Sequence, residues 1–173
     1  MSIIKKQGIG TWISLGTILL TLVALIIYGV ACAAGDGLEV ANASQPFYDF
    51  TRPEDGAMVG AVVTCGILTL VFLVGAIVLG QLKFEGTVGK VVGIVIDVLR
   101  AVVPVLLMLT LLYYVYGSFT GLGWTFFSNE ELEIYEEAIA VGQKVIAALV
   151  ITAIATVASI VAAFFSITKK DAE

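Results

Sequence analysis

Residues 57–82 read AMVGAVVTCGILTLVFLVGAIVLGQL, a run of 26 residues without a single charged side chain. A helix needs about 20 mostly apolar residues to cross the hydrocarbon core of a bilayer. Three further stretches of this kind occupy residues 10–34, 91–116 and 144–167. The sequence therefore predicts an all-α membrane protein, in which residues 1–173 form a single domain of four transmembrane helices.

The composition agrees with this prediction and argues against catalysis. The mean hydropathy is +1.06, 60% of the residues are hydrophobic and only 13% are charged. Histidine is absent and there are two cysteines, so the commonest general base and the commonest metal ligand are missing. We therefore expect a protein that is not an enzyme and that carries no cofactor or metal site.

The basic residues predict how the helices are oriented. Four spans place the N-terminal segment, the connection between the second and third spans, and the C-terminal segment on one side of the membrane. The positive-inside rule makes this side cytoplasmic. The sequence thus predicts an antiparallel bundle with both termini in the cytoplasm, and the short loops favour a bacterial plasma membrane. The basic residues of these segments are Lys5, Lys6, Lys83, Lys90, Lys169 and Lys170.

The opposite side of the membrane would carry two acidic loops, residues 35–56 and 117–143. The net charge of −5 comes mostly from these loops and would repel a nucleic-acid backbone. Their aromatic and acidic side chains either rest on the bundle and in water or dock a partner protein. The candidate partner surface consists of Phe47, Tyr48, Phe50, Glu130, Glu133 and Glu137.

The second outer loop also contains a helix start signal. Ser128 and Glu131 have the spacing of a capping box, in which each side chain satisfies a free backbone N–H of the first turn. We expect a helix that begins near Asn129 and runs without a break into the fourth span. Gly142 is the expected position of a bend.

The strongest polar group inside the predicted spans is Asp97, Arg100 and Pro104. Asp97 and Arg100 share a helix face, and Pro104 cannot donate a hydrogen bond to the Arg100 carbonyl four residues back. A span over 91–111 would bury Arg100 near the bilayer centre, whereas a span over 101–117 would place both charges at the cytoplasmic edge. Their role is either a structural ion pair or a polar coupling point to a solute or a partner helix.

Small residues recur on single faces of the predicted helices, which allows membrane helices to approach closely. Such faces pack the bundle itself or bind other subunits, and the sequence does not separate these roles. The two cysteines, Cys32 and Cys65, are expected to differ in depth and to remain thiols. The small residues concerned are Ser14, Thr17, Thr21, Gly56, Gly60, Thr152, Ala155, Ser159, Ala162 and Ser166.

These features favour a non-catalytic integral membrane subunit. We expect it to lie in the lipid bilayer and to join a larger complex of transport or secretion type through its helices and acidic outer loops. The alternative is a small oligomeric transporter or channel with a polar path near Asp97 and Arg100. The sequence does not identify the partner, the solute or the oligomeric state.

Overall fold

Four long helices make up most of the chain in the computed structural model. The structure describes residues 7–36, 56–82, 84–127 and 135–167. Each helix contains a segment long and apolar enough to cross a membrane, which confirms the prediction of an all-helical membrane protein with four such helices. The helices are α2 (Ile9–Asp36), α3 (Gly56–Gln81), α4 (Gly86–Phe127) and α5 (Tyr135–Ala163).

The helix bounds differ from the predicted spans mainly in α4 and α5. With 42 residues, α4 extends beyond residues 91–116 at both ends and is about 63 Å long at 1.5 Å per residue. It continues through Pro104. The described part of α5 begins at Tyr135, runs through Gly142 and ends at Ala163, four residues before the predicted 167. The early end of α5 has a tertiary cause, which is described below.

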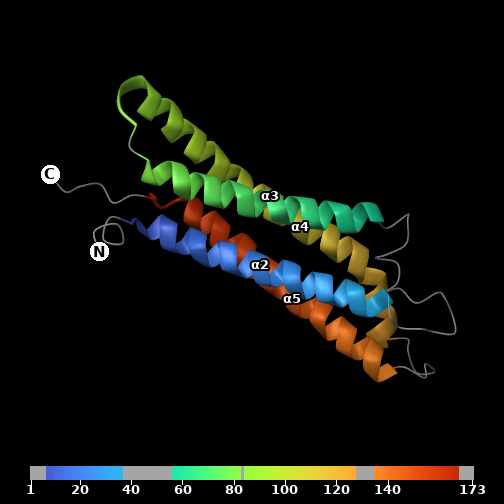
Figure 1. The fold of residues 1–173 in the computed structure, drawn as a ribbon. Coiled ribbons are helices and arrows are strands. Elements are labelled where there is room, and N and C mark those ends of the chain that lie inside the picture. The colour runs from blue at the N-terminus through green and yellow to red at the C-terminus, as the bar shows by residue number, and fades with distance from the viewer. Residues whose placement is uncertain (1–6, 37–55, 83, 128–134, 168–173) are drawn as a thin grey trace.

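The helices form a ring in which each one packs against two neighbours (Figure 1). α2 lies beside α3 and α5, and α4 lies beside the same two helices. Across the ring, the side chains of Tyr28 in α2 and Tyr114 in α4 meet edge to face, with ring centroids 4.5 Å apart. This arrangement brings all four helices around one core.

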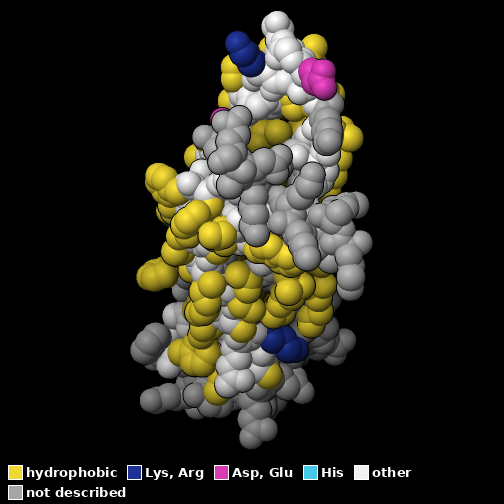
Figure 2. Space-filling model, turned by 90° about the vertical axis from the view of Figure 1, so that its left-hand side faces the viewer, with side chains coloured by type: hydrophobic (Ala, Val, Ile, Leu, Met, Phe, Trp, Pro, Cys, Tyr) yellow, Lys and Arg dark blue, Asp and Glu magenta, His cyan; other side chains and the backbone are white. Residues whose placement is uncertain are grey.

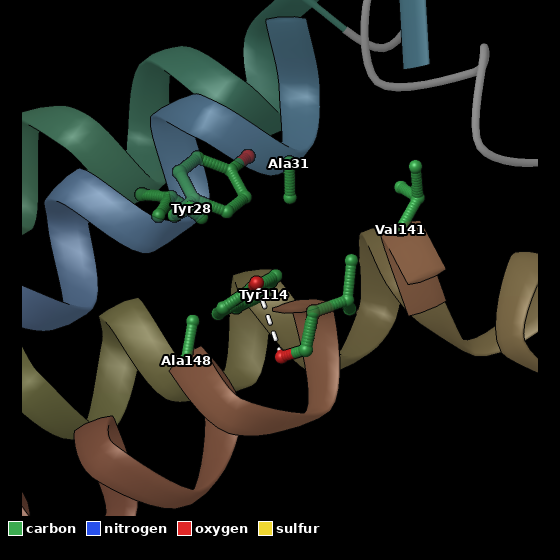
Figure 3. Packing of buried hydrophobic residues seen from close by; sticks show 7 residues of the cluster. Tyr28, Ala31, Tyr114, Val141 and Ala148 are labelled. Atoms are coloured by element: carbon green, nitrogen blue, oxygen red, sulfur yellow. Dashed lines mark hydrogen bonds between the residues drawn. The ribbon is translucent and has the colours of Figure 1, made fainter. Parts of the chain in front are cut away.

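The two tyrosines organise the core near the end of α2. The Tyr114 hydroxyl donates a hydrogen bond of 3.2 Å to the Val145 carbonyl of α5, and small side chains such as Ala31 and Ala148 fill the space around the rings (Figure 3). A buried tyrosine usually finds such a partner for its polar tip. The bond therefore fixes α5 against α4 at this level of the bundle.

Most of the small-residue faces pack inside the bundle. Thr17 and Thr21 are buried, as is Ser14 one turn earlier. The Thr21 and Thr152 hydroxyls each donate a hydrogen bond to the carbonyl four residues back, at 2.8 and 2.7 Å. Each hydroxyl therefore has its hydrogen-bond partner within its own helix. These positions serve close packing. The buried members on α5 are Thr152, Ala155, Ser159 and Ala162.

Two predicted small-residue positions lie elsewhere. Gly60 is exposed, and a Cβ atom added to it would meet nothing within 4 Å, so Gly60 forms no close helix contact. Ser166 is exposed because α5 has already ended at Ala163. Cys32 and Cys65 are half-buried thiols and are not joined to each other.

The described surface is largely apolar, as a bilayer requires. Among the described side chains seen in Figure 2, hydrophobic ones predominate, and charged ones appear at only a few points. Over the start of α4, the exposed charged residues are Glu85, Lys90 and Asp97.

Candidate functional site

Arg100 extends from α4 to the end of α5. Its side chain is only 7% exposed, and Nη2 donates hydrogen bonds to the carbonyls of Ala162 and Phe165. The last four carbonyls of a helix lack partners within the helix, and the helix dipole places partial negative charge there. The guanidinium group of Arg100 supplies hydrogen-bond donors for these carbonyls and a positive charge opposite the dipole. Arg100 therefore caps α5.

The start of α2 completes this cap from the other side. The Gly8 amide donates to the Ile167 carbonyl at 2.6 Å, and the Gly10 amide donates to the Ser166 carbonyl at 3.2 Å. The Thr11 hydroxyl also donates to Ile167, at 2.7 Å. Because these donors hold residues 164–167 in a turn, α5 ends at Ala163 although the apolar sequence continues. We call this group the α5 cap: Gly8, Gly10, Thr11 and Arg100 with the carbonyls of Ala162, Phe165, Ser166 and Ile167.

The α5 cap requires glycine at two positions. A Cβ atom added to Gly8 or to Gly10 would lie within 3.0 Å of three backbone atoms of residues 165–167. Real Cβ atoms essentially never approach that closely, and backbone atoms cannot swing aside as a side chain can. The two glycines therefore allow the α2 backbone to reach the α5 carbonyls.

One donor of the capping arginine is left over. Arg100 Nε is buried and has no acceptor among the residues that the structure describes. A buried donor without a partner costs about 1–3 kcal/mol relative to a satisfied one.

A pocket of about 290 Å³ lies beside Arg100, between the end of α3, the first part of α4 and the end of α5. Most of its lining residues are apolar, but polar atoms form the larger part of its surface, and Asp97 contributes an exposed carboxylate. The Arg100 acceptors on α5 are backbone carbonyls, and Asp97 lies one turn earlier on α4. The lining residues are Leu79, Gly80, Leu82, Phe84, Gly89, Val92, Gly93, Ile96, Asp97, Arg100, Ser166 and Ile167.

The pocket lies beside the ends of the candidate spans of α3 and α5. Candidate spans begin at Ile9 and end at Gln81 and Ala163, next to the residues of the α5 cap. Gln7 and Gln81 exchange side-chain hydrogen bonds of 2.7 and 3.0 Å at the same end of the bundle. The candidate span of α4, Gly86–Phe119, contains both Asp97 and Arg100, so these bounds do not separate the two readings of the third span.

Among the remaining predicted site residues, the structure describes the side chain of Pro104 alone. Pro104 is half-buried one turn beyond Arg100, within the continuous helix α4. Glu137 lies in the first turn of α5, and its side chain is outside the part of the chain that the structure describes. The same holds for all of Phe47, Tyr48, Phe50, Glu130 and Glu133.

Sequence reasoning singled out Arg100 and Asp97 but missed the part of the α5 cap that α2 supplies. The available signal was the pair Gly8 and Gly10, directly before and at the start of the first apolar stretch. Such a pair indicates close backbone approach. Thr11 carries no comparable signal, because a threonine in an apolar helix is common.

No protein-family model, curated protein or solved structure matches this chain. Within residues 7–36, 56–82, 84–127 and 135–167, no group of three or more His, Cys, Asp or Glu side chains is placed to hold a metal ion. The site offers a guanidinium group, a carboxylate and apolar walls, which together suit the binding of a polar group with an apolar tail.

Proposed function

We propose that this protein is a non-catalytic membrane subunit that joins a larger complex of transport or secretion type, mainly through the outward side of α4. The observation that carries the proposal is the unequal burial of the helices. Only 17% of the most apolar window of α4 is buried within the chain, against 39% in α5. The longest helix of the bundle is thus the one that the chain covers least.

The exposed side of α4 has the pattern of a helix-packing seam. Val91, Val98, Val105 and Leu112 recur every seven residues, and each is exposed by 54 to 57%. A second exposed row follows three residues after the first, which completes a heptad pattern. We call these two rows the α4 seam: Val91, Val98, Val105 and Leu112 with Ile94, Ala101, Met108 and Val115. A partner helix could pack along its length.

The interior supports a subunit rather than a solute path. The buried Arg100 is engaged with α5 carbonyls, and buried hydroxyls such as Thr21 and Thr152 are bonded within their own helices. A cavity between Tyr28 and Tyr114 measures about 10 Å³, which is room for about one water molecule.

Site-specific crosslinking tests the proposed α4 interface. A photoreactive residue at Val105 or Leu112, introduced in the native host membrane, is expected to give a discrete adduct with a foreign membrane protein. The matched controls are Leu19 and Ile26 of α2, which are 62% and 57% exposed and should give lipid adducts. Equal protein adducts at all four positions would contradict the proposal.

The second candidate function is a small oligomeric transporter or channel. The pocket of about 290 Å³ beside Asp97 and Arg100 is the observation in its favour. In the crosslinking experiment, this function predicts that the α4 positions join two copies of the same chain. Flux in liposomes that falls in Asp97→Asn with an intact fold would then support transport.

We further propose that the helices cross a bacterial plasma membrane as an antiparallel bundle with both termini in the cytoplasm. In support, Gly8 and Gln81 lie with the α5 cap at one end of the bundle, whereas Tyr28, Tyr114 and Val145 meet towards the other end. In the sequence, the segments next to this first end carry the lysines that the positive-inside rule uses, and Lys90 is the one that the structure describes.

A C-terminal fusion checks this orientation. A fluorescent protein that matures only in the cytoplasm should be bright when fused after residue 173, and a periplasmic phosphatase fused there should be inactive. The reverse pattern would contradict the proposed orientation.

A further inference from the structure

The pocket beside Arg100 combines two opposite charges with an apolar wall. Arg100 is buried, Asp97 is exposed, and both line the pocket. Leu79, Val92 and Ile96 supply apolar surface next to them. A ligand that fits needs an anionic group, a cationic group and an apolar part.

The order of the two charges is fixed by α4. Arg100 lies level with the end of α5, where it binds Ala162 and Phe165. Asp97 precedes it by three residues, which is about 4.5 Å along the helix axis, on the side that extends past the end of α5. The guanidinium group is therefore nearer the middle of the bundle, and the carboxylate is nearer the end where α3 and α4 are connected.

We propose that this pocket binds a membrane phospholipid with a phosphoethanolamine headgroup. In such a lipid, the phosphate lies next to the acyl chains and the ammonium group lies farther out. The phosphate would accept hydrogen bonds from Arg100, the ammonium group would pair with Asp97, and the acyl chains would lie against the apolar wall. The order of phosphate and ammonium in the lipid, from the acyl chains outward, thus matches the order of Arg100 and Asp97 along α4.

Arg100 can bind the phosphate without releasing α5. A guanidinium group has five N–H donors in a planar fork, and the bonds to Ala162 and Phe165 use those of Nη2. Nε is buried and so is not available to a ligand, but Nη1 carries two more N–H groups that can bind the phosphate. Bonds between guanidinium and phosphate are charge-assisted and stronger than neutral ones.

Asp97 makes the site selective among lipids. A phosphatidylglycerol headgroup carries the same phosphate but has no cation, so the Asp97 carboxylate would repel it. This inference goes beyond the proposed subunit role and does not depend on it, because a lipid can bind to an isolated subunit.

Native mass spectrometry of the detergent-purified full chain tests the proposal. The protein is titrated with phosphatidylethanolamine or phosphatidylglycerol of identical acyl chains, and the dissociation constant of the first bound lipid is measured. We expect wild-type protein to prefer phosphatidylethanolamine by about fivefold, the size of a partly exposed charge pair. In Asp97→Asn, this preference should fall to about one.

The matched control is Glu85→Gln, which removes one exposed carboxylate just before α4 but does not touch the pocket. It should keep the wild-type preference. Equal binding of the two lipids to wild-type protein, or an equal loss of preference in Glu85→Gln, would overturn the proposal. Displacement of the lipid by an equal concentration of soluble phosphoethanolamine would also overturn it, since the site would then serve the free headgroup.

Discussion

Replacement of Arg100 by leucine is expected to lower the free energy of unfolding by about 2–3 kcal/mol. Two hydrogen bonds from a charged donor are each worth about 1.5–3 kcal/mol, and removal of a buried charge with an unpartnered Nε offsets part of this loss. Arg100→Lys keeps the positive charge at the end of α5, so it should lose only about half as much unfolding free energy as Arg100→Leu.

Thermal unfolding in detergent, followed with a thiol-reactive dye, measures this effect because Cys32 and Cys65 are half-buried. Hydrogen exchange should also accelerate in residues 160–167 and remain unchanged near Val145. The matched control is Lys90→Leu, which removes an exposed cation from the same helix and should change stability by less than about 0.5 kcal/mol. Wild-type stability in Arg100→Leu would show that the α5 cap does not depend on this side chain.

Hydropathy was sufficient to locate the four helices, because a bilayer imposes a minimum length on any apolar span. α2 and α3 begin and end within two residues of the predicted 10–34 and 57–82. The end of α5 was not predictable in this way. Phe164, Phe165 and Ile167 are apolar, and what stops the helix is a set of donors from α2 and α4.

The sequence predicted only part of the candidate site, because the partners of Arg100 are also set by tertiary contacts. Arg100 stood out as a charge within an apolar run, but its acceptors are backbone carbonyls, which every residue possesses. No sequence pattern therefore marks Ala162 and Phe165 as its partners. The pocket beside it depends on how the ends of α3 and α5 meet α4 in space.

The sequence also did not reveal which face of α4 is buried and which is exposed. Val103 and Leu107 are almost fully buried, whereas Val105 and Leu112 are more than half exposed. In a soluble helix, the polar face would identify the outside. In a membrane both faces are apolar, so only the packing of α4 on α3 and α5 reveals which side is left for lipid or a partner.

Of all substitutions that add one methyl group to α2, Gly10→Ala should destabilise the protein most. The new Cβ atom would lie 2.8 Å from the Ser166 carbonyl oxygen and closer still to the Phe165 carbonyl oxygen, both in the α5 cap. Overpacking of this kind typically costs 1–3 kcal/mol, and the rigidity of the backbone places Gly10→Ala at about 3 kcal/mol. The same dye-based unfolding experiment measures the loss.

Gly16→Ala is the control that separates crowding from helix propensity. Gly16 lies on the same helix, and nothing lies within 4 Å of an added Cβ atom. Gly16 lies inside the helix, where replacement of glycine by alanine by itself stabilises by about 0.5–1 kcal/mol, whereas Gly10 lies in the first turn. Gly16→Ala should therefore be slightly more stable than wild type, and Gly10→Ala should be much less stable. If both variants instead gained stability, α2 would not need to approach the α5 carbonyls, and the end of α5 would have to be set by Arg100 alone.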